Sequence, residues 1–153
     1  MKSKNSFFYL FFQVLLASSM LSSCAPKVEE IRFGSDQCHY CKMIISDPKF
    51  GAELVTDKGK VFKFDAAECM LNHLKEIEDE GQEFSFMMAI SYDTPKQLHD
   101  VHALHFLVSE NMPSPMGGNL NAFSNKTLAD EMKREKSGEL FSWASLASNY
   151  GLD

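Results

Sequence analysis

The sequence predicts an α+β fold in which strands come before a helix twice along the chain. In the first half, the turn signal Asp57-Lys58-Gly59-Lys60 separates two stretches with strand character, and an apolar helical face follows. In the second half, strand-like apolar stretches again come before a segment with helical spacing. The 130 residues that follow the N-terminal 23 of the 153 are enough for one modest domain.

The N-terminus has the parts of a secretory signal. Lys2 and Lys4 give a basic start, and residues 7–17 are almost wholly apolar. This stretch is too short for a bilayer core, which takes about 20 residues. It leads to Leu21-Ser22-Ser23-Cys24, which resembles the lipobox of bacterial lipoproteins. We therefore expect a signal peptide over residues 1–23 and a membrane-anchoring lipid on Cys24; the alternative is a secreted protein with a chance cysteine there.

The charge balance argues against two kinds of binding partner. The chain has 15 basic and 21 acidic residues, and the signal peptide would remove Lys2 and Lys4 but no acidic residue. The mature net charge of −8, from 13 basic and 21 acidic residues, argues against nucleic acid, which binds a basic face. It also argues against electrostatic binding to anionic lipid, so the lipid on Cys24 would supply the anchoring.

The first half is expected to form a first unit over residues 31–81. Asp65 is the expected N-cap of its helix, and Gly81 ends that helix. The expected elements are a tether at 24–30, a strand start at 31–33, a tight loop at 36–42, strands at 43–46, 51–56 and 61–64, and a helix over 66–80.

The second half is expected to form a second unit over residues 82–153. Thr94-Pro95 is expected to break its first strand, because proline interrupts a strand pattern. The expected elements are strands at 84–92, 103–108 and 120–123, a loop at 111–119, a helix over 126–136 and a last turn or helix at 141–147.

The strongest chemical signal is the run Cys38-His39-Tyr40-Cys41-Lys42-Met43. Two thiols separated by two residues can point into one small volume, so this spacing occurs in metal sites and in redox disulfides. The thioether of Met43 adds a soft, neutral ligand, and thiolate with thioether suits copper(I) better than zinc. Cys38, Cys41 and Cys69 are the cysteines after Cys24, and an odd number points to a metal or redox role.

Three other interpretations of this motif stay open. Cys38 and Cys41 could form a disulfide in an oxidising compartment. They could instead belong to a structural zinc site completed by Cys69 and His73, which are one helical turn apart. Either would make the chain a stabilised surface lipoprotein that acts as an interaction module. A thioredoxin-type pair would make it a thiol oxidoreductase, but that fold places a helix after the motif, where residues 44–46 look like a strand.

A second signal is the loop Met112-Pro113-Ser114-Pro115-Met116-Gly117-Gly118. Its prolines stiffen the backbone and its glycines allow close approach, so Met116 is poorly placed for a core. The alternative is a tight turn with Met116 packed on a neighbouring strand. His99, His102 and His105 are more simply a solvated rim than a metal site. No hydrolytic or phosphate-binding motif is present, so we expect no enzyme.

Together these pieces resemble the NosL family, the copper-binding accessory lipoproteins of nitrous oxide reductase. Where the family often shows Cys-Gly-Met, this chain has Cys41-Lys42-Met43. The matching stretches are the lipobox at Cys24, residues 36–47, residues 50–53, residues 63–65 before Cys69, and residues 114–118 with 122–123.

The resemblance implies a periplasm-facing lipoprotein that binds copper(I) as a metallochaperone and helps to load the copper centres of nitrous oxide reductase. It implies a fold of two small, related ββαβ units in one compact mature region. The implied partners are nitrous oxide reductase or its assembly machinery, and an unidentified copper donor. By motif position the predicted copper ligands are Cys41, Met43 and Met116, then Cys38, and after these Cys69 and His73.

Overall fold

The computed structural model describes residues 25–152, so the predicted signal peptide and the lipidation site Cys24 lie outside the described residues. No helix among residues 25–152 is long and apolar enough to cross a membrane. The strands are β1 (Ala52–Thr56), β2 (Val61–Phe64), β3 (Phe84–Ser91), β4 (Thr94–Asp100), β5 (His105–Val108), β6 (Leu120–Phe123) and β7 (Glu139–Phe141). The helices are α2 (Ala67–Glu76), α3 (Lys126–Lys136) and α4 (Trp143–Asn149), with short 3₁₀ turns η1 (Glu78–Glu80) and η2 (Val101–Ala103).

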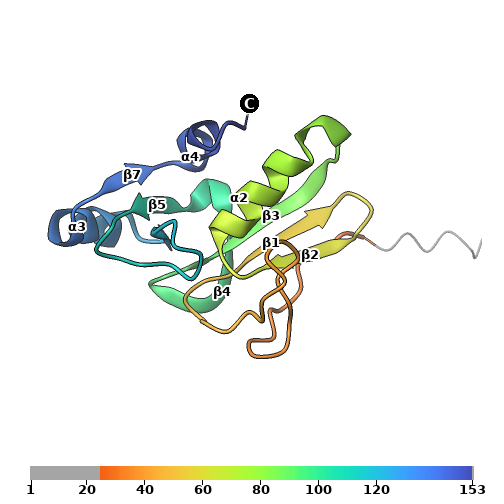
Figure 1. Cartoon of the computed structure of the whole chain (residues 1–153), viewed down its shortest axis with the longest axis horizontal. Helices are drawn as coiled ribbons and strands as arrows, with labels where there is room; N and C mark the ends of the chain where they lie inside the picture. Colours follow the sequence, from red (N-terminus) through yellow and green to blue (C-terminus); the bar gives the residue numbers. More distant parts are fainter. Residues whose placement is uncertain (1–24, 153) are drawn as a thin grey trace, which may run out of the picture.

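Two antiparallel sheets form the molecule, one of order β2-β1-β3-β4 and one of order β6-β5-β7 (Figure 1). Each sheet contains the same arrangement: a hairpin, then a helix, then a strand that returns beside the first strand of the hairpin. The first arrangement is β1-β2-α2-β3 and the second is β5-β6-α3-β7. The predicted α+β fold with two related ββαβ units is therefore confirmed.

The division between the sheets differs from the expected unit boundary at Gly81. Strand β3 pairs with β1, with Ala52 opposite Ala89, and β4 pairs with β3, with Met88 opposite Asp100. Residues 84–100 thus belong to the first sheet, and the division falls after Asp100. Gly81 does end the helical segment, in a left-handed conformation with φ of 64°, but strand pairing across the helix is non-local and local patterns do not reveal it.

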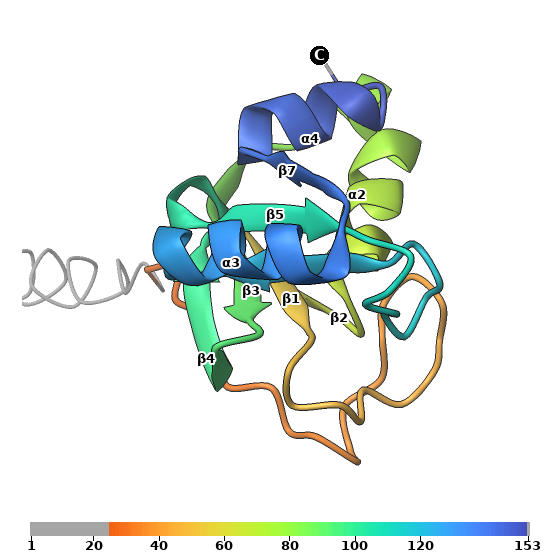
Figure 2. The same ribbon diagram turned by 90° about the vertical axis from the view of Figure 1, so that its left-hand side faces the viewer.

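One apolar core joins the two sheets. Leu54 and Met70 of the first unit and Phe106 and Leu146 of the second belong to the same buried cluster. Figure 2 shows α3 in front of the second sheet, α4 at the top next to β7, and α2 at the right. Because neither sheet has a separate core of this size, the two units form one compact body.

Two expected strands of the first half are absent. Residues 31–33 form no strand, and residues 43–46 contribute a single bridge between Gln37 and Ile44. The reason is that the chain folds back on itself here: the Cys38 N–H donates to the Met43 carbonyl at 2.8 Å, and the Ile45 N–H donates to the Asp36 carbonyl at 2.9 Å. These residues, 36–45, form what we call the cysteine loop.

Two strands of the second half were not expected. Thr94-Pro95 does not end strand structure but starts β4, which lies at the edge of its sheet, where proline is tolerated. Strand β7 lies within a region expected to be a connection and the start of a last turn.

The segment before the cysteine loop is pinned to the first sheet. The Glu29 N–H donates to Glu53 Oε1 at 2.8 Å. Lys63 Nζ donates to the Glu30 carbonyl at 2.8 Å and to Asp36 Oδ2 at 2.9 Å. The expected tether of residues 24–30 is therefore held to the sheet at its last two residues.

Candidate metal centre

Three thiols meet between the cysteine loop and α2. The sulfur atoms of Cys38, Cys41 and Cys69 all lie within 4.8 Å of one another. Cys38 and Cys69 are buried, Cys41 is partly exposed, and all three are free thiols. We call this group the three-thiol cluster. The sulfur atom of Cys69, a weaker candidate by sequence, therefore lies within the same 4.8 Å limit as those of the two cysteines of the motif.

Backbone hydrogen bonds hold the cysteine loop in position. The Lys42 N–H donates to the Cys38 carbonyl at 3.1 Å, which closes the turn that carries Cys41. The His39 N–H donates to the Lys63 carbonyl at 2.7 Å, which attaches the loop to the open edge of β2. Since β2 leads directly into α2, this attachment brings both cysteines of the loop to the first turn of the helix, where Cys69 lies.

Helix α2 begins without a side-chain cap. Its N-cap is Ala66, and Asp65, the expected N-cap, does not cap it. Burial and the neighbouring Cys38 raise the pKa of the Asp65 carboxyl, while the Ser46 backbone acts in the opposite direction.

The cluster favours one thiolate. Hydrogen bonds from the Cys69 thiol, and then from the backbone of Asp65 and Cys41, lower the pKa of Cys38 in spite of its burial. The shared hydrogen bond with Cys38, together with burial, raises the pKa of Cys69, and burial raises the pKa of Cys41. A metal ion that bound all three sulfur atoms as thiolates would therefore release protons.

The two predicted thioether ligands lie in different surroundings. Met43 is 47% exposed, while its backbone carbonyl holds the cysteine loop closed. Met116 is partly buried and packs against the shared core, in a turn closed by a 3.0 Å hydrogen bond from the Gly117 N–H to the Ser114 carbonyl. A turn with a packed Met116 was the alternative to a ligand role, so that role stays a prediction.

His73 lies in an aromatic group beside the cluster. Its ring centroid is 4.9 Å from that of His39, 5.3 Å from that of Phe62 and 5.4 Å from that of Phe64. Its Nε2 is buried without a hydrogen-bond partner among the described residues, and burial lowers the pKa of the imidazole. The nitrogen is not part of the group that converges within 4.8 Å, so three thiols come together here without His73, and a ligand role for His73 stays a prediction.

The remaining histidines form no comparable site. In residues 25–152, the three-thiol cluster is the one group of three or more histidine, cysteine or acidic side chains close enough to share a metal ion. His99 bonds to Thr94 Oγ1 at 2.7 Å, and the His102 ring packs against Trp143. These contacts account for the two rings without a metal.

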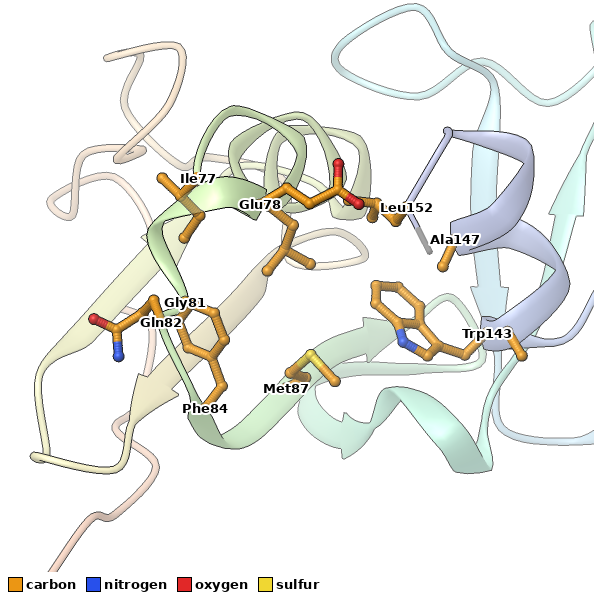
Figure 3. A pocket seen from close by; sticks show the side chains of 11 residues that line it. Ile77, Glu78, Gly81, Gln82, Phe84, Met87, Trp143, Ala147 and Leu152 are labelled. Atoms are coloured by element: carbon orange, nitrogen blue, oxygen red, sulfur yellow. The ribbon is translucent and has the colours of Figure 1, made fainter.

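A hollow of about 420 Å³ lies elsewhere, between the end of α2, β3 and α4 (Figure 3). The apolar side chains that line it include Leu74, Ile77, Phe84, Met87, Trp143 and Leu152. No thiol or imidazole lines this groove, so it is no candidate for a metal centre.

Comparison with known families decides the classification. The family model of NosL matches residues 32–150, which include the cysteine loop, α2 and the Met116 turn. The chain belongs to the NosL family. A search of curated protein sequences found no match. Among solved structures, the copper chaperone NosL from Shewanella denitrificans has a similar fold, with a TM-score of 0.67 and 21% identity over 77% of this chain and 93% of that one.

Proposed function

We propose that this NosL-family protein is a copper(I) metallochaperone and not an enzyme. The observation that carries the proposal is the convergence of the Cys38, Cys41 and Cys69 sulfur atoms within 4.8 Å. The similarity in fold to a copper chaperone supports it. The recipient would be a copper-requiring protein, which we take to be nitrous oxide reductase or its assembly machinery.

The chemistry of the cluster suits copper(I) as cargo. Thiolates are soft ligands and bind a soft monovalent ion in preference to hard cations. Two of the three thiols are buried and Cys41 is partly exposed, so copper could be shielded on one side and reached by a partner's ligand on the other. The thioethers of Met43 and Met116 would add weak ligands that exchange readily.

We also propose that the chain works at a membrane surface, facing the periplasm. The N-terminal signal and Leu21-Ser22-Ser23-Cys24 support export and lipidation. Mass spectrometry of the mature protein tests this. We expect the mass of residues 24–153 plus a diacylglyceryl group, with or without a further acyl chain. An unmodified Cys24 in membrane-fractionated protein would contradict it.

The first experiment is a competition titration. Residues 25–153, reduced under anaerobic conditions, are titrated with copper(I) against a chromophoric chelator, with zinc in a parallel series. We expect tight binding of about one copper(I) per chain, because one cluster of soft ligands is present, and weak binding of zinc. Failure to compete for copper(I), with zinc retained, would favour the zinc-stabilised interaction module instead.

Variants then test the ligands. Cys69→Ser removes one of the three thiols, and we expect it to weaken copper(I) binding by at least about tenfold. The double variant Met43→Leu with Met116→Leu should also weaken binding, whereas Met132→Leu on α3 is the matched control. If the double variant binds like the parent, the site consists of thiols alone and the methionine assignment is wrong.

A further inference from the structure

Glu68 connects α2 to the loop that carries Met116. This loop, residues 109–119, lies beside the N-terminal end of α2 (Figures 1 and 2). The Ser114 hydroxyl donates to Glu68 Oε1, and the Leu120 N–H donates to the same oxygen at 3.4 Å. Both hydrogen bonds cross from the second unit to the first, over 46 and 52 residues of sequence.

The contact around Glu68 is close as well as polar. A Cβ added to Gly118 would lie 2.9 Å from Glu68 Cγ, so a side chain at this position would displace the glutamate or the loop. Glu68 is itself only 3% exposed. The Glu68 side chain therefore packs closely against residues 114–120, and Met116 lies within this stretch.

Burial of this carboxyl is unfavourable for stability alone. Its Oε2 is buried without a hydrogen-bond partner among residues 25–152, and burial raises its pKa. A buried acidic group that lacks full hydrogen bonding costs free energy, and an apolar residue of similar volume usually packs at lower cost. A role in holding the loop explains why a carboxyl occupies this position.

Both ends of the contact between Glu68 and Ser114 lie close in sequence to predicted copper ligands. Glu68 directly precedes Cys69 in the first turn of α2, and Ser114 lies two residues before Met116. One side chain thus links the helix turn that supplies a thiol to the loop that supplies a predicted thioether.

We propose that Glu68 is a positioning residue, which holds the Met116 loop against the three-thiol cluster without touching the metal. The proposal rests on the proposed copper(I) function and deepens it. It predicts that copper(I) affinity depends on a carboxylate that is not a ligand.

The test compares Glu68→Ala with a matched variant, Asp93→Ala. Asp93 is also a carboxylate that ties the two sheets together: its Oδ1 accepts from the Ser124 N–H at 2.9 Å and its Oδ2 from the Ser124 hydroxyl at 2.7 Å. It lies between β3 and β4, on elements that carry no cysteine. The protein is residues 25–153, whose described part contains both sheets and their core.

Copper(I) affinity is the first readout. Glu68→Ala should weaken it by about 10- to 100-fold, the range known for residues that orient metal ligands. Glu68→Gln, whose amide oxygen can still accept both hydrogen bonds, should recover most of the loss. Asp93→Ala should leave the affinity of the folded protein unchanged. Met116→Leu should weaken the parent but add little to Glu68→Ala, because both changes remove the same contribution.

The second readout needs no metal. With ¹³C-methyl methionine, the Met116 methyl resonance should move in metal-free Glu68→Ala and stay in place in Asp93→Ala. Ser114→Ala removes the hydroxyl that donates to Glu68, and it replaces Glu68→Ala in this test if Glu68→Ala does not fold. An unmoved Met116 resonance, or an equal loss of affinity in Asp93→Ala, overturns the proposal. A parent that fails to bind copper(I) overturns the proposed function, while the resonance still tests the positioning.

Discussion

Glu53 is the second residue of β1, and its side chain has no exposed surface. Its Oε1 accepts the Glu29 N–H, and its Oε2 has no hydrogen-bond partner among the described residues. Burial raises its pKa from 4.5 to about 7, although the charge of Lys63, opposite it on β2, acts in the other direction. The folded protein therefore binds a proton here that the unfolded chain releases at lower pH.

This shift predicts a pH-dependent stability. Between about pH 4.5 and 7 the folded state binds more protons than the unfolded state, so the free energy of unfolding falls as pH rises through this window. Glu53→Gln removes the ionisation, and we expect it to raise the free energy of unfolding at pH 8 by roughly 2–3 kcal/mol. Urea unfolding at pH 4.5 and at pH 8 measures the difference.

The exposed Glu131 provides the control for this prediction. Glu131→Gln should change stability little at either pH, because a surface carboxyl is solvated in both states. A Glu53→Gln effect of the same size at both pH values would mean that packing, and not ionisation, sets the cost of this residue.

At the scale of elements, the turn of the cysteine loop holds Lys42 in the left-handed region, with φ of 65°. Glycine adopts this conformation without strain, whereas lysine does not. Lys42→Gly should therefore raise the free energy of unfolding by about 1 kcal/mol, reduced by the loss of the bond from Lys42 Nζ to the His39 carbonyl. Chemical denaturation of the metal-free protein measures it.

Lys96 allows a matched comparison, since it has φ of 68° in β4, away from the thiols. Lys96→Gly should gain similar stability with no change in copper(I) affinity. If Lys42→Gly destabilises while Lys96→Gly stabilises, the contact with His39 matters more than the backbone strain.

Elements defined by local signals were predicted well. The helix over residues 126–136 is observed with those bounds as α3, because its determinants are local: Asn125 Oδ1 caps it by accepting the Leu128 N–H at 3.1 Å. The edge strand β4 was not predicted, because proline is excluded from central strands but not from edges, and position in a sheet is a tertiary property.

In the candidate site, too, the local features could be predicted from the sequence and the tertiary contacts could not. The spacing of Cys38 and Cys41 by itself indicates that their thiols converge. That Cys69 joins them depends on the bond between the His39 N–H and the Lys63 carbonyl, which attaches the loop to β2. Glu68 was not singled out at all, since nothing in its neighbourhood along the chain indicates a contact with Ser114.

For the molecule as a whole, copper(I) would act as a link between the cysteine loop and α2. A ligand that binds only the folded state stabilises it by mass action, by about 4 kcal/mol at a free concentration a thousand times Kd. We therefore expect copper(I) to raise the melting temperature under anaerobic conditions. Circular dichroism measures this, and Cys69→Ser should lose most of the gain.

The control for this prediction is Asp93→Ala, which should lower stability but leaves the thiols in place. It should start from a lower melting temperature and show the same increase with copper(I). An increase that persists in Cys69→Ser would mean that copper(I) binds elsewhere.

The pinning of Glu29 and Glu30 to the first sheet sets a limit on distance from the membrane. Four residues lie between Cys24 and Glu29. The five steps from one to the other cover at most about 3.3–3.6 Å each in a fully extended chain, or roughly 17 Å in all. A lipid on Cys24 would therefore hold the folded body close to the membrane surface. A binding partner would then meet it in a thin layer above the lipid headgroups, by lateral diffusion along the membrane.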